Sequence, residues 1–92
     1  MSDEHRIDFT DFVMSIASAG FVGLGLAPNP GTEKTEINLE LARHNIDLLD
    51  LMKEKTKGNL SAEESRLLEQ MLYEMRMRFV EARAKVQQNK IV

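Results

Sequence analysis

The chain has 92 residues, a net charge of −3 and no cysteine. This length predicts one small domain with a modest core, which usually needs support from disulfides, metals or partner subunits. Disulfides and thiolate metal sites are excluded by the lack of cysteine, and the acidic balance argues against nucleic-acid binding. We therefore expect a homo-oligomer, with a two-fold dimer as the first expectation.

The N-terminal part of the chain lacks the features of an export signal and of a membrane-spanning segment. The acidic residues Asp3, Glu4, Asp8 and Asp11 stand against Arg6 alone, whereas a signal peptide begins with positive charge. The uncharged run over 12–27 is shorter than the ~20 residues that span a bilayer. These features predict a cytoplasmic protein without a transmembrane segment.

A first helix is predicted over residues 8–25, after a polar segment over 1–7 that we expect to be frayed. Its apolar residues recur at three- and four-residue steps, the helical period: Phe9, Phe12, Val13, Ile16, Gly20 and Leu24. Ser15, Ala19 and Gly23 form a stripe of small side chains that permits close approach of another helix. We assign this stripe to an oligomer interface.

A second helix is predicted over residues 39–57, beyond a loop that contains two prolines. Asn38 is a favourable N-cap, and Gly58 is suited to the left-handed conformation that ends a helix. Apolar side chains cover more than half of the circumference: Leu39, Leu41, Ala42, Ile46, Leu48, Leu49, Leu51 and Met52. Asn45 lies among them, either as a buried hydrogen-bonding residue that fixes register or as a partly exposed residue without that role.

A third helix is predicted over residues 62–88, opened by a capping box of Ser61 and Glu64. One face carries the apolar residues Leu67, Leu68, Met71, Leu72, Met75, Phe79, Ala82 and Val86. A second stripe lies nearly opposite and consists of Tyr73, Met77, Val80 and Ala84. It is interpreted as a self-association surface, the alternative being scattered surface residues of no special role. The fold class is therefore all-α, a three-helix bundle with an antiparallel first pair and a final helical hairpin, completed by homo-oligomerisation.

The turn between the second and third helices is a candidate ligand site. Lysines lie beside the start of a helix, whose free N–H groups favour anions, in the segment Lys55, Thr56, Lys57, Gly58, Asn59 and Ser61. Helix capping explains most of these residues as well as anion binding does. Thr56 and Asn59 are the two residues that capping explains least. Small-anion or nucleotide binding is the resulting alternative function.

Other chemistries have weaker support. Glu40, His44 and Asp47 share one side of the second helix, but such charges more often form a solvated face than a metal site. Glu63 and Glu64 occupy the position where a helix-turn-helix protein reads bases, so they disfavour nucleic acid. No nucleophile–base pair is apparent. We expect no catalytic residue, no metal and no cofactor.

From Phe12 to Phe79 the chain resembles a small bacterial family described as domain of unknown function 1844. Three segments support this resemblance: Leu24-Gly25-Leu26 with Pro28 and Pro30, Leu41-Ala42-Arg43-His44 with Ile46-Asp47-Leu48-Leu49, and Glu54-Lys55-Thr56-Lys57-Gly58-Asn59-Leu60. The resemblance implies a compact helical domain in bacteria and assigns no catalytic residue. The leading hypothesis is a non-enzymatic module that associates with itself and serves as a scaffold for an unidentified protein partner. A further alternative is peripheral membrane association through the first helix.

Overall fold

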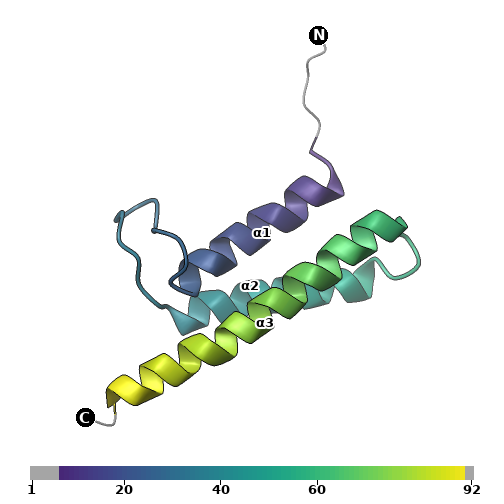
Figure 1. Cartoon of the computed structure of the whole chain (residues 1–92). Coiled ribbons are helices and arrows are strands. Elements are labelled where there is room, and N and C mark those ends of the chain that lie inside the picture. Colours follow the sequence, from purple (N-terminus) through teal and green to yellow (C-terminus); the bar gives the residue numbers. More distant parts are fainter. Residues whose placement is uncertain (1–6, 91–92) are drawn as a thin grey trace.

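The computed structural model describes residues 7–90 and contains three helices within that range (Figure 1). They are α1 (Phe9–Gly23), α2 (Leu39–Lys55) and α3 (Ala62–Lys90). The all-α prediction is confirmed, and each helix end lies within two residues of the predicted one. Apart from Ile7, the segment predicted to be frayed lies outside the described residues.

The start of each helix follows from a short polar side chain at the N-cap. In α1, Asp8 Oδ1 accepts from the Asp11 backbone N–H at 2.9 Å, and Asp11 Oδ2 accepts from the Asp8 N–H in return. In α2, Asn38 Oδ1 accepts from the Leu41 N–H at 3.1 Å, as predicted. These carboxylate and amide oxygens satisfy backbone donors that a helix leaves unpaired in its first turn.

The start of α3 has the predicted capping box. Ser61 Oγ accepts from the Glu64 backbone N–H at 3.1 Å, while the Glu64 carboxylate accepts from the Ser61 N–H at 2.9 Å. The reciprocal pair fixes the direction in which the chain enters α3.

The ends of α1 and α2 lie two residues earlier than predicted, each for a local reason. Gly25 adopts φ +76° directly after the C-cap of α1, so the helix stops at Gly23. At the end of α2, the Thr56 hydroxyl donates to the carbonyl of Met52 at 2.7 Å, and Gly58 then reverses the chain with φ +78°. Left-handed glycines at these positions are a common way to end a helix.

Helices α1 and α2 pack antiparallel, as predicted, and their backbones approach closely. Gly23 at the end of α1 lies against Ala42 near the start of α2, and Gly20 lies against Asn45 one turn further along. The loop over 24–38 is held at its base because the Asn38 N–H donates to the carbonyl of Gly23 at 2.7 Å. Small residues at the contact are what allow this spacing.

The core lies where the three helices meet, around Gly20, Asn45 and Met75. Its buried apolar members are Val13, Ala17, Leu24, Ala42, Ile46, Leu49, Leu68, Leu72, Met75 and Ala82. Asn45 is buried, with 5% exposure, and its Nδ2 donates to the carbonyl of Leu41 at 2.8 Å. This hydrogen bond stays within α2, so the buried position is confirmed, whereas the bond does not link two helices.

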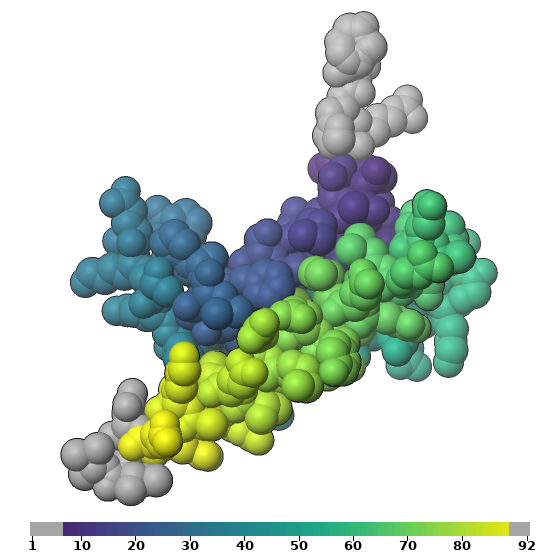
Figure 2. All heavy atoms as spheres, in the orientation of Figure 1, coloured from purple at the N-terminus to yellow at the C-terminus, as the bar shows by residue number. Residues whose placement is uncertain are grey.

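Helix α3 forms a long ridge along the front of the molecule (Figure 2). The Cα atoms span 55 × 31 × 16 Å, so the molecule is elongated and thin in one direction. Because so thin a body cannot enclose every face of its helices, large apolar side chains remain exposed on all three: Phe12, Met14, Leu51, Tyr73, Met77 and Val80.

Candidate interaction surface

The second stripe of α3 is exposed, as its spacing from the core face predicts. Tyr73 is 67% exposed, Met77 48% and Val80 55%, and Ala84 is also exposed. On the opposite side of the same helix, Leu68, Leu72 and Met75 are fully buried in the core. The exposed stripe is therefore separate from the surface that holds the monomer together.

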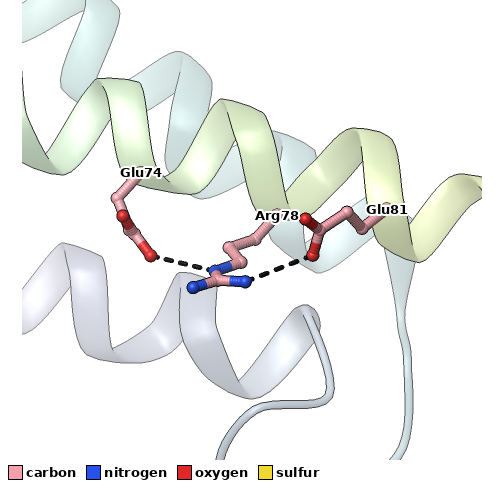
Figure 3. Close-up of polar contacts among 3 residues, drawn as sticks. All are labelled: Glu74, Arg78 and Glu81. Carbon is pink, nitrogen blue, oxygen red and sulfur yellow. Dashed lines mark hydrogen bonds and ion pairs between the residues drawn. The ribbon is translucent and has the colours of Figure 1, made fainter.

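One flank of the stripe carries an ion-pair network within α3 (Figure 3). Arg78 lies between two carboxylates, with Nε 2.9 Å from Glu74 Oε2 and Nη1 3.3 Å from Glu81 Oε1. Hydrogen bonds to Glu74 and then to Glu81 raise the pKa of Arg78 above its usual value, so it stays charged. Both carboxylates are substantially exposed, and they lie on the edge of this flank that is nearer the stripe.

The other flank is basic and contacts α2. Arg76 forms an ion pair with Asp50 of α2, and the guanidinium carbon of Arg83 lies 6.0 Å from the centre of the Phe79 ring. Between the two helices a groove of about 540 Å³ reaches the stripe at Val80. Its lining combines apolar residues with both signs of charge, namely Leu39, Glu40, Arg43, Ile46, Asp47, Asp50, Arg76, Phe79, Val80 and Arg83.

The three members of the small-residue stripe predicted on α1 differ in burial. Ser15 is exposed and Ala19 is half-buried, whereas Gly23 is buried against the backbone of Ala42 in the same chain. The small residues that admit α2 to α1 are Gly20 and Gly23. Close approach of a helix to Gly23 thus occurs within the monomer, and the role of Ser15 and Ala19 in an oligomer stays a prediction.

The candidate anion turn directs its polar groups to its own backbone. Thr56 and Ser61 make the capping bonds described above, and the Asn59 N–H donates to the carbonyl of Thr56 at 2.9 Å. A hollow of about 440 Å³ adjoins the turn and is lined by Asp50, Lys53, Glu54, Thr56, Lys57, Gly58, Leu60, Ser65, Leu68 and Glu69. Its three carboxylates offset its two lysines, and Glu64 already caps the start of α3. Anion binding here stays a prediction with little electrostatic support.

A family model with the description Domain of unknown function (DUF1844) matches residues 6–81. The chain belongs to this family. The matched segment includes α1, α2 and the part of α3 that carries Tyr73, Met77 and Val80. No curated protein and no solved structure is significantly similar to the chain.

The remaining polar residues of this family member form no candidate metal site within the described part of the chain. His44 and Asp47 are both exposed on α2, and no group of three histidine, aspartate or glutamate side chains among residues 7–88 is arranged to hold a metal ion. Every buried side-chain nitrogen or oxygen in that range has a hydrogen-bond partner. No described helix is both long and apolar enough to cross a membrane.

Sequence reasoning did not find the Arg76–Asp50 ion pair, which joins α3 to α2. The two residues are far apart in the chain, and each alone resembles an ordinary surface charge. The available signal was that Asp50 borders the apolar arc of α2 on the side of Leu39 and Ile46, where a long arginine from the next helix can reach it.

Proposed function

We propose that this chain is a non-enzymatic helical module that associates with itself through the stripe Tyr73, Met77, Val80 and Ala84. The observation that carries the proposal is the exposure of three bulky apolar side chains on the face of α3 opposite the core. Monomeric soluble proteins rarely expose large contiguous apolar patches, and such patches mark sites of association.

The composition of the stripe supports a protein contact in particular. Tyrosine and methionine are enriched at interfaces, and charged residues are depleted at their centres and placed at the rim. Here Tyr73 and Met77 occupy the centre, whereas Arg76 and Glu81 lie to either side. Arg78, Glu74 and Glu81 pair with one another along one flank of α3. Their charges therefore lie beside the apolar centre of the stripe and not within it.

Sedimentation equilibrium over a concentration series tests the proposal. We expect the wild-type chain to form a dimer, and the double variant Met77→Glu/Val80→Glu to be monomeric with unchanged far-UV circular dichroism. Both side chains lie outside the core, so the fold should tolerate the charges.

Leu51→Glu is the matched control, because Leu51 is a comparably exposed apolar residue, at 49%, on α2. It should leave the dimer intact. A wild-type chain that stays monomeric at every concentration, or a double variant of unchanged mass, would contradict the proposal.

A second candidate function is peripheral membrane association through α1. Phe12 and Met14 are exposed, and no charged side chain occurs over 12–32. An exposed apolar side chain such as Phe12, on a helix without charges after Asp11, can insert at the boundary between headgroups and acyl chains. Flotation with neutral phosphatidylcholine vesicles is the test: co-flotation that Phe12→Ser abolishes would support it, and protein that stays at the bottom would exclude it.

A further inference from the structure

The exposed stripe belongs to a longer seam with alternating three- and four-residue steps. The seam consists of Gln70, Tyr73, Met77, Val80, Ala84 and Gln87, all exposed. This is the spacing of the a and d positions of a coiled coil, with Gln70, Met77 and Ala84 at a and the others at d. The seam is apolar in its middle and polar at both ends, so its contact surface is limited to about three turns.

The residues that border the seam are segregated by charge. Positions g carry Arg76 and Arg83, preceded by Glu69, and positions e carry Glu74 and Glu81. In coiled coils these bordering charges set partner choice and orientation. The acidic border lies on the side of the Arg78 network, and the basic border lies on the side of α2.

We propose that α3 pairs in parallel with α3 of a second copy of this chain, in register about Met77. This inference rests on the proposed self-association and adds the orientation and register of the contact. A parallel two-fold arrangement places the basic border of each copy along the acidic border of the other, so that Arg76 meets Glu81 of the second copy twice.

An antiparallel pair would bring like charges together. When Met77 packs against Val80 of a reversed copy, Arg76 faces Arg83 and Glu74 faces Glu81, each of them twice, and like-charged neighbours at such borders are destabilising. The parallel arrangement has one kind of unfavourable border contact, Glu69 with Glu74 of the second copy, which also occurs twice. Arg78, bound to Glu74, offsets that repulsion.

The charges that the pairing needs remain accessible in the monomer. Arg76 bonds to Asp50 yet keeps 50% of its side chain exposed, and Glu81 keeps 59%. An arginine has five N–H donors, so one contact to Asp50 leaves others for a second carboxylate. Neither α1 nor α2 covers the seam, because its members are exposed.

Disulfide crosslinking of single-cysteine variants tests the orientation. The chain has no cysteine of its own, so only the introduced thiols can crosslink. The variants are Gln70→Cys, Met77→Cys and Ala84→Cys, with Lys85→Cys as the control on another side of α3. Under mild oxidation, a parallel seam brings each of the first three next to its own copy, within the Cα separation of under ~7 Å that a disulfide requires. Each should form a disulfide-linked dimer, and Lys85→Cys should not.

An antiparallel seam gives a different pattern. The introduced thiols of two Gln70→Cys chains, or of two Ala84→Cys chains, would then lie about 15 Å or more apart. An equimolar mixture of Gln70→Cys and Gln87→Cys would instead crosslink one variant to the other, because these two positions face each other across a reversed seam. That result would overturn the orientation and leave self-association standing. Sedimentation of a dimer in which none of the seam variants crosslinks would overturn the seam, and a monomer in sedimentation would overturn the proposed function.

A gain of affinity provides an independent check. In the parallel seam, Gln88 lies at the e position that meets Arg83 of the second copy. Gln88→Glu should lower the dissociation constant of the dimer by about two- to five-fold, the effect expected of an exposed ion pair that forms twice. Gln88→Lys should raise that constant. Equal effects of the two variants, or effects in the reverse order, would contradict the parallel pairing.

Discussion

Gly23 of α1 lies directly against the backbone of Ala42 in α2. A Cβ atom on Gly23 would be 2.6 Å from the Ala42 nitrogen and 3.0 Å from its Cα. Backbone atoms cannot turn away as a side chain can, so Gly23→Ala must force α1 and α2 apart. We expect a loss of about 2 kcal/mol in the free energy of unfolding, typical of overpacking, measured by urea denaturation monitored by circular dichroism.

The matched control for this prediction is Gly31→Ala, in the loop between α1 and α2. A Cβ on Gly31 approaches only the exposed side-chain oxygen of Asn29, at 3.3 Å. Its stability should change little. Equal losses in the two variants would show that the α1–α2 contact is looser than the structure describes.

A substitution at Gly58 measures the free-energy cost of the left-handed backbone conformation without a steric clash. It has φ +78°, and a Cβ there would meet no atom within 4 Å. Gly58→Ala should therefore cost about 1 kcal/mol from the left-handed conformation alone. Gly58→Asn should lose less, because asparagine tolerates that region. Urea midpoints of the three proteins test this order, and an alanine variant as stable as the wild type would refute it.

Thr56 stabilises the end of α2 through its hydroxyl. Oγ1 donates to the Met52 carbonyl at 2.7 Å, an oxygen that also accepts from the Thr56 backbone N–H at 2.9 Å. Thr56→Val keeps the shape and removes the donor, so we expect a loss of about 1 kcal/mol. Thr56→Ser retains the hydroxyl and should keep most of the stability. Thermal or urea unfolding that ranks valine above serine would contradict this role.

The proposed dimer predicts that thermal stability depends on protein concentration. A partner that binds only the folded chain stabilises it by mass action. The midpoint of thermal unfolding should therefore rise with concentration for the wild-type chain and for Leu51→Glu, and should be constant for Met77→Glu/Val80→Glu. Calorimetry over about two decades of protein concentration distinguishes these cases, and a constant wild-type midpoint would count against association.

The helix boundaries were predictable because local chemistry determines them. Asn38, Ser61 and Gly58 each act through atoms within a few residues along the chain, and all three behave as predicted. The core face and the exposed stripe of α3 were also predictable, because the helical period alone separates Leu72 from Met77.

Features that depend on tertiary packing were not predictable in the same way. The sequence offers several small residues on α1, and only the angle at which α2 crosses it selects Gly20 and Gly23 over Ser15 and Ala19. Asn45 was ambiguous for a related reason: its burial depends on the neighbouring helices, and its amide finds a partner in its own helix. The end of α2 at Thr56 was not predictable either. The Thr56 hydroxyl could have bonded to water, and it bonds instead to the Met52 carbonyl.

Tyr73 is the only tyrosine of a chain that has no tryptophan, and it projects from the seam rather than from the core, with 67% exposure. Ultraviolet emission from this protein therefore arises almost entirely at one surface position. In an unfolded chain and in a folded monomer the ring is bathed by water, and it leaves water only if something covers the seam. The single tyrosine is therefore a natural spectroscopic probe of whether the seam is covered.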